Sequence, residues 1–167
     1  MVLSSDELVR LLQHEVKILR HLAGKVTAAG RDYRPTPKQR SAVELLRYLA
    51  MMGPALVDVA RSGTFDPQAW TVRERATDQL TFEQAVEAIA AQSEYYAGLA
   101  PVLTEAFLRG EIAPWGEAMS RGRFLVQYVL CGFTAYRMQL FLYLKASGRP
   151  ELGTTELWDG TDPAPAS

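Results

Sequence analysis

The sequence predicts an all-α protein, a four-helix bundle, and three observations support this fold class. Ser or Thr followed three residues later by Glu or Gln, a pattern typical of helix starts, recurs along the 167 residues. The apolar residues behind these starts repeat at intervals of three and four, which places them on one face of a helix. No segment shows the alternating β-branched pattern of a strand.

The first helix is predicted from residue 5 to about residue 29. Ser4 and Glu7 form a capping box, in which each side chain accepts a hydrogen bond from a backbone N–H group of the first turn. Gly30 then ends the helix. Its apolar face consists of Leu8, Leu11, Leu12, Ile18, Leu19, Leu22 and Val26.

The second helix is predicted to begin with Thr36 as its N-cap and Pro37 at its first helical position. Pro54 lies in its interior, where it removes a backbone hydrogen bond and is expected to bend the helix. Gly63 ends it. The apolar face behind the start is formed by Val43, Leu46, Leu49, Met52, Leu56 and Val59.

The third helix is predicted from Thr81, with a kink at Pro101 before it ends at Gly110. Residues 63–80, which precede it, span roughly 60 Å when extended at about 3.3 Å each. A 25-residue helix is only about 38 Å long, so this connection can run the full length of the bundle. We therefore expect an up-down-down-up order with a long crossover between the second and third helices.

The fourth helix is predicted from Ser120 to Ala146, and it is apolar on all faces. A bundle helix needs only one apolar stripe, so the apolar side chains on its other faces must be covered by another part of the chain or by a partner. Residues 1–148 are expected to form the bundle, and residues 149–167 a tail that packs back on it or on a partner and is disordered at its end. The second candidate for covering these faces is another copy of the chain, which would form a homodimer through this helix.

Charge and cysteine content exclude several classes of function. With 18 basic and 19 acidic residues the net charge is −1, so no overall field favours nucleic acid as a partner. The apolar stretch 124–144 contains Arg137, which is costly in a bilayer, so we expect no membrane partner. The acidic start does not fit a signal peptide and the single Cys131 cannot form an intrachain disulfide, which together favour a cytoplasmic location.

Two segments resemble motifs of the DinB-like proteins, a bacterial family of four-helix bundles. Residues 33–49, with the sequence YRPTPKQRSAVELLRYL, resemble the start of the family's second helix. Residues 136–145, YRMQLFLYLK, resemble its helix-four signature, in which His-Arg-x-Gln-Leu precedes further apolar residues. The resemblance implies the bundle fold with its long second connection. It also implies an activity similar to thiol-dependent S-transferases and mycothiol-dependent isomerases, which carry a divalent metal on three histidines.

The chain departs from this family at the metal site. The positions that match the three histidines are Tyr48, Gly132 and Tyr136. A phenol with a pKa near 10 is a poor ligand for zinc or nickel, and glycine has no side chain. His14 and His21 lie two helical turns apart, too far to bind one ion together. We therefore expect a degenerate metal site with no metal and no other cofactor.

Two hypotheses stay open for the former metal position. In one, Tyr48 and Tyr136 hydrogen-bond to each other or to Glu44 and Gln139 and close the space. In the other, the same residues line an aromatic cleft, and Gly132 leaves room beside the phenols for a small ligand. The candidate ligand-binding residues are thus Tyr48, Gly132, Tyr136, Glu44 and Gln139.

Other polar and aromatic residues have structural interpretations. Glu15, within the apolar stripe of the first helix, is expected to form an internal ion pair with Arg137, Arg47 or Arg40. Cys131 lies between apolar neighbours and is expected to be buried and inert. Two tryptophans on loops either cap the core or line the mouth of a cleft, namely Trp70 and Trp115.

These observations predict a small-ligand-binding or interaction protein that acts as a homodimer without the three-histidine metal site. The alternative is a thiol-dependent S-transferase-like enzyme that works without histidine-bound metal. In that alternative, Tyr48 or Tyr136 donates a hydrogen bond to a thiolate. No catalytic residue is assigned by the sequence.

Overall fold

In the computed structural model, which describes residues 3–164, almost all the regular secondary structure is helical. Its long helical segments are α1 (Ser5–Ala23), α2 (Ala42–Ser62), α4 (Phe82–Ala97) and a continuous run near the C-terminus. That run consists of α6 (Arg121–Phe124), the π-helical η2 (Leu125–Leu130) and α7 (Cys131–Ala146). The predicted all-α class is confirmed.

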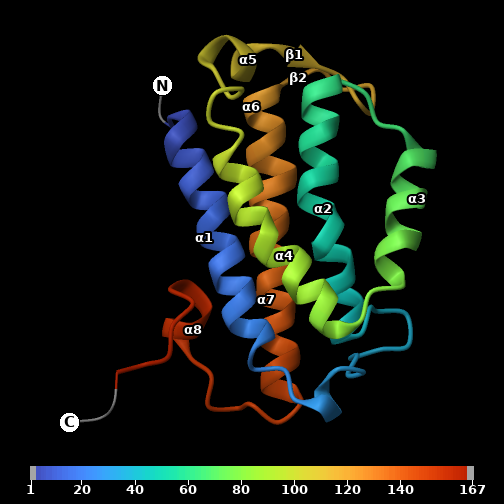
Figure 1. Cartoon of the computed structure of the whole chain (residues 1–167), viewed down its shortest axis with the longest axis vertical. Helices are drawn as coiled ribbons and strands as arrows, with labels where there is room; N and C mark the ends of the chain where they lie inside the picture. Colours follow the sequence, from blue (N-terminus) through green and yellow to red (C-terminus); the bar gives the residue numbers. More distant parts are fainter. Residues whose placement is uncertain (1–2, 165–167) are drawn as a thin grey trace.

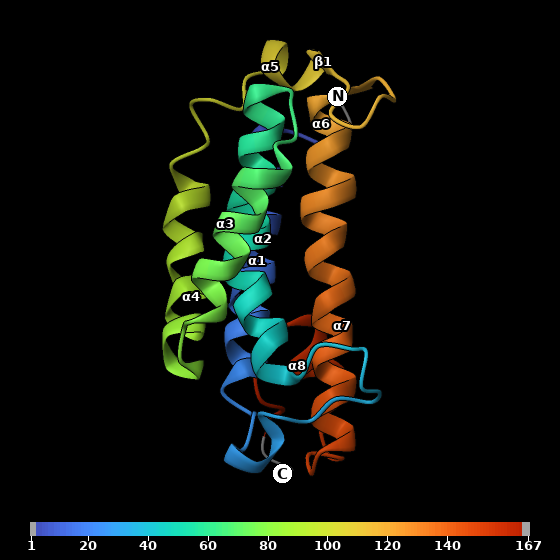
Figure 2. The same cartoon turned by 90° about the vertical axis from the view of Figure 1, so that its right-hand side faces the viewer.

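The four long segments lie side by side. Figure 1 shows α1 running downward from the N-terminus, α2 and α4 running upward, and α6 through α7 running downward. Both α4 and α7 pack against α1 and α2, so α4 and α7 occupy opposite corners of the bundle. The connection between α2 and α4 contains α3 (Pro67–Asp78), which returns the chain along the outside of α2 (Figure 2).

Three predicted helix starts are observed. The Ser4 hydroxyl accepts a hydrogen bond from the Glu7 amide at 3.2 Å at the start of α1. The Thr81 hydroxyl accepts one at 3.1 Å at the start of α4, and the Ser120 hydroxyl accepts one at 3.2 Å at the start of α6. These caps satisfy backbone N–H groups that have no partner within a first turn.

The predicted start of the second helix is wrong. Thr36 lies in a turn and its hydroxyl donates to Gln39, whereas α2 begins at Ala42 with Ser41 as its N-cap. Both positions satisfy the capping pattern, but only Ser41 is buried, and its amide donates to Glu44 Oε2 at 2.7 Å. Tertiary burial therefore decides between two equivalent local signals.

Other predicted boundaries also shift. The first helix ends at Ala23, and residues Ala28–Gly30 form a separate 3₁₀ turn, η1. The third helix ends at Ala97 rather than residue 110, and a short α5 (Glu105–Arg109) follows. Two elements were not predicted. One is α3, and the other is a β-hairpin whose strands, β1 (Glu111–Ile112) and β2 (Met119–Ser120), have two residues each.

A buried polar network compensates for the proline inside α2. Pro54 has no N–H group to donate to the carbonyl of Ala50, one turn earlier. The side chain of Gln92 on α4 donates to that carbonyl at 3.1 Å and to the Leu49 carbonyl at 2.9 Å. The Tyr96 hydroxyl in turn donates to Gln92 Oε1 at 3.0 Å. The carbonyl that Pro54 leaves without a helical partner is therefore paired through Gln92.

The tail covers part of the bundle. Its helix α8 (Thr154–Trp158) packs against α1 and α7, and Leu152 and Leu157 are buried. On α7, however, Met138 and Leu142 remain exposed, so the tail does not cover the whole apolar surplus. The tail end predicted to be disordered, residues 165–167, lies outside the described residues. Within residues 3–164, no helix is long and apolar enough to cross a membrane.

Candidate functional site

An open pocket of about 470 Å³ lies between α2, the α3 segment and the η2–α7 helix. Half of its lining residues are aromatic, and none is Asp, Glu, Lys, Arg or His. Apolar pockets of about 300–1,000 Å³ are the usual size for small-molecule sites. The lining residues are Tyr48, Met52, Leu56, Phe65, Trp70, Trp115, Gln127, Tyr128, Cys131, Gly132, Ala135 and Tyr136.

Three of the five predicted site residues meet in this pocket. Tyr48 on α2 and Tyr136 on α7 are in edge-to-face contact, with ring centroids 5.2 Å apart and an interplanar angle of 70°. Gly132 lies one helical turn before Tyr136, and a methyl group added there would meet only Met52, at 3.4 Å. The two phenols therefore contact each other without filling the space beside Gly132.

The other two predicted residues lie outside the pocket. Glu44 caps the start of α2 and forms an ion pair with Arg34 at 2.9 Å. Gln139 donates a hydrogen bond to the Tyr143 hydroxyl at 2.5 Å. Both side chains have hydrogen-bond partners elsewhere, and neither lines this pocket.

Much of the pocket wall comes from segments outside the four long helices. Phe65 lies before α3 and Trp70 lies on it, with their ring centroids 5.6 Å apart. Trp115, from the β1–β2 connection, lies 5.8 Å from Phe65 and 4.8 Å from Tyr128. Of the two interpretations for the loop tryptophans, the structure supports the one in which they line a cleft.

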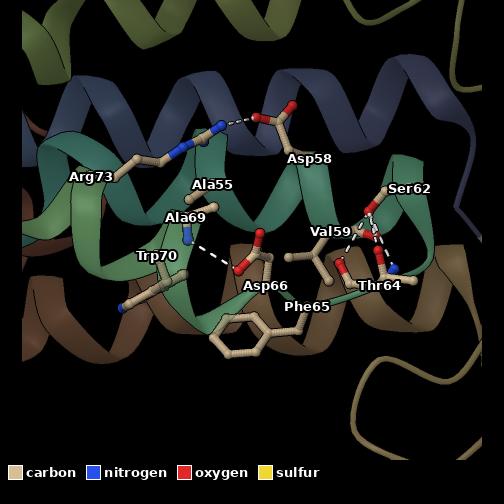
Figure 3. A pocket seen from close by; sticks show the side chains of 10 residues that line it. All are labelled: Ala55, Asp58, Val59, Ser62, Thr64, Phe65, Asp66, Ala69, Trp70 and Arg73. Atoms are coloured by element: carbon tan, nitrogen blue, oxygen red, sulfur yellow. Dashed lines mark hydrogen bonds and ion pairs between the residues drawn. The ribbon is translucent and has the colours of Figure 1, made fainter.

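Phe65 and Trp70 also border a smaller hollow of about 270 Å³ between α2 and α3. Figure 3 shows these two rings along one edge of the hollow and an ion pair along the opposite edge. That ion pair joins Arg73 on α3 to Asp58 on α2 at 2.7 Å. The ion pair therefore links α3 to α2 beside the two rings that also line the larger pocket.

The surroundings of Tyr48 keep its phenol neutral. Burial, followed by the neighbouring Tyr136, raises the pKa of Tyr48 well above its ordinary value. The Arg40 guanidinium lies 4.0 Å over the Tyr48 ring and opposes this rise in pKa without reversing it. Tyr48 is therefore a hydrogen-bond donor at neutral pH, not a phenolate.

The residues at this position do not fit a metal ion. Tyr48, Gly132 and Tyr136 supply two phenol groups and no imidazole, thiolate or carboxylate. Across residues 3–164, no three His, Cys, Asp or Glu side chains are grouped closely enough to hold an ion. The two histidines have other contacts: His14 Nε2 lies 2.8 Å from the Trp158 carbonyl and His21 lies 3.6 Å from Asp162.

Two further expectations have different outcomes. Cys131 is exposed at the edge of the pocket, so the prediction that it is buried is wrong. Its apolar sequence neighbours lie on other faces of the helix. Glu15 forms the expected internal ion pair with Arg137 at 3.1 Å, and the Thr134 hydroxyl donates to the same carboxylate oxygen at 3.0 Å.

No family sequence model matches the chain, and no curated protein sequence does. A solved structure does match it: the crystal structure of YjoA, a DinB-like protein from Bacillus subtilis. The two share 22% sequence identity and a TM-score of 0.67, over 89% of this chain and 96% of that one. At this identity the similarity shows a common fold, the one that the sequence motifs imply.

Proposed function

We propose that this chain, which has the fold of a DinB-like protein, is a small-ligand-binding protein whose ligand occupies the aromatic pocket. The observation that carries the proposal is an open volume of about 470 Å³ surrounded by six aromatic side chains. Aromatic rings that are exposed to water are energetically unfavourable. A ligand that covers these rings removes their apolar area from water and forms contacts with them. The pocket lies where the family resemblance places a metal centre.

The proposal is tested with the neutral fluorescent probe N-phenyl-1-naphthylamine. We expect saturable binding to the wild type and slower reaction of Cys131 with Ellman's reagent when the probe is present. Cys131 is the only cysteine of the chain and lies at the pocket edge, so its thiol reports on this site alone. Gly132→Leu places a side chain in the pocket and should weaken probe binding about tenfold or more.

Gly132→Ala is the matched control, because a methyl group there reaches only ordinary contact with Met52. This variant should keep most of the probe affinity. Equal affinity in the wild type and Gly132→Leu, with no protection of Cys131, would contradict the proposal.

One observation favours a second candidate, a thiol-dependent S-transferase-like enzyme without histidine-bound metal. Burial keeps the pKa of Tyr48 above its ordinary value, so its hydroxyl is available to donate a hydrogen bond to a thiolate. Glutathione or mycothiol should then raise the melting temperature, because ligand at 100 times its Kd adds about 2.7 kcal/mol of stability. A Tyr48→Phe variant should lose this effect. Thiols that leave the melting temperature unchanged would count against an enzyme.

We further propose that the protein acts as a homodimer through α7. Its uncovered face beyond Cys131 consists of Ala135, Met138 and Leu142, which repeat at intervals of three and four and include no charged side chain. Such a stripe resembles the contact seam of paired helices. Light scattering at tens of micromolar should give twice the 18.6 kDa mass of the chain.

A charge on this face should separate the two copies. We expect Leu142→Glu to have the mass of one chain. Val72→Glu, at an equally exposed apolar position on α3, should leave the mass doubled. A wild-type protein that is monomeric at these concentrations would rule out the homodimer.

A further inference from the structure

We infer that the aromatic pocket selects planar, uncharged aromatic molecules that carry a carbonyl or similar hydrogen-bond acceptor, such as aryl ketones and quinones. This inference rests on the proposed ligand-binding function and names the class of ligand. It follows from the rings, the hydrogen-bonding groups and the charges around the pocket, taken in turn.

The rings present flat apolar surfaces from several directions. Tyr48 and Trp70 face the pocket from α2 and α3, with centroids 6.2 Å apart. Trp115 and Tyr128 contact each other edge-to-face on another side of the lining, with centroids 4.8 Å apart. Aromatic pairs favour offset or edge-to-face contacts at centroid distances of about 4.5–7 Å. A flat conjugated ligand offers such contacts to several of these rings together.

The polar groups of the lining are mainly donors. Three tyrosine hydroxyls and two indole N–H groups are present, and among the described residues none of them forms a hydrogen bond. Indole N–H groups only donate, and a phenol that keeps its proton donates as well. The one amide, Gln127, already accepts from Arg123 at 3.2 Å. An acceptor on the ligand therefore finds free partners here.

The charges around the pocket disfavour ions of either sign. A cationic ligand has no carboxylate in the lining to pair with. The Arg40 guanidinium already occupies a face of the Tyr48 ring at 4.0 Å, which repels a second cation from the place where cation–π contact would form. An anionic ligand finds no Lys, Arg or His in the lining. A neutral molecule avoids the desolvation cost that either ion incurs.

The test compares probes with nearly the same ring skeleton. We expect 9-fluorenone, which has one carbonyl, to displace N-phenyl-1-naphthylamine with an affinity about tenfold higher than that of fluorene, which has none. The cation 10-methylacridinium and the anion fluorene-9-carboxylate should bind more weakly than fluorenone. The double variant Tyr48→Phe/Tyr136→Phe keeps both rings and removes both hydroxyls, so it should bring the ratio of fluorenone to fluorene affinity towards one.

The outcomes separate the two proposals. If fluorene and fluorenone bind equally and Gly132→Leu weakens both, the pocket binds ligands but the inferred class is wrong. Tightest binding by the acridinium or by the carboxylate would overturn the inferred class in the same way. If none of the probes binds in a manner sensitive to Gly132→Leu, the ligand-binding function itself fails.

Discussion

Arg137→Met is expected to lower the free energy of unfolding by about 3–5 kcal/mol at pH 7. Arg137 and Glu15 form an ion pair in which both side chains are almost fully buried, at 4% and 8% exposure. Removing the guanidinium leaves a carboxylate without a counter-charge in an apolar interior. The loss should appear as a lower midpoint of urea unfolding with little change in slope.

The penalty depends on pH, and its sign follows from the pKa of Glu15. Burial raises that pKa above its ordinary value, and Arg137 opposes the rise. Without Arg137 the pKa of Glu15 rises further, so the folded variant binds a proton more readily than the unfolded chain does. Its stability should therefore recover as the pH falls through the folded pKa, and the penalty should be smaller at pH 5 than at pH 7.

Two variants control this prediction. Replacing both partners, as Glu15→Leu/Arg137→Met, removes the uncompensated charge and should restore most of the stability. Thr134 keeps a hydrogen bond to the Leu130 carbonyl at 3.1 Å in that background. Arg109→Met breaks an exposed pair with Glu105 and should cost less than about 0.5 kcal/mol. Equal losses for Arg137→Met and Arg109→Met would contradict the importance of burial.

Gly53→Ala is expected to lower the free energy of unfolding by about 2 kcal/mol. In an exposed helix this substitution stabilises by about 1 kcal/mol, because alanine is the better helix former. At Gly53, however, the added methyl group overlaps the Tyr96 hydroxyl and lies 2.6 Å from the Phe133 ring. Both rings are fully buried and rigid, so the overpacking outweighs the gain in helix propensity.

Gly132→Ala makes the same chemical change in α7, where the methyl group meets only the flexible end of Met52 at 3.4 Å. This variant should keep or exceed the stability of the wild type. The midpoint of thermal unfolding should fall for Gly53→Ala, whereas for Gly132→Ala it should rise or stay unchanged. A Gly53→Ala protein as stable as the wild type would show that the two rings can move aside.

Local signals predicted the parts of the fold that local physics controls. The caps at Ser4, Thr81 and Ser120 are found where the sequence places them, because a side-chain oxygen and a first-turn amide need only each other. The second helix was misplaced because Thr36 and Ser41 satisfy the same rule, and burial in the folded protein chose Ser41. A signal for α3 was present in Asp66, an N-cap residue that precedes a proline.

The sequence predicted the two tyrosines at the centre of the candidate site but not the aromatic residues that complete its lining. Tyr48 and Tyr136 were found because the family resemblance aligned them, and the structure brings their rings together. Phe65 joins the lining through the packing of the α3 segment, and Tyr128, on η2, contacts Trp115 of the β1–β2 connection. No local pattern encodes either contact. Cys131 was judged from its sequence neighbours, although helical geometry turns it away from them to the surface.

Helix α3 has no buried side chain of its own, although it carries Trp70. It is held against the bundle by that half-buried ring and by two partly exposed ion pairs, Arg73 with Asp58 and Arg40 with Glu74. Moving it outward would break the contact of Trp70 with Tyr48 and these ion pairs, but α3 has no fully buried side chain to expose. Local opening of α3 is therefore expected to cost less free energy than local opening of any of the four long helical segments.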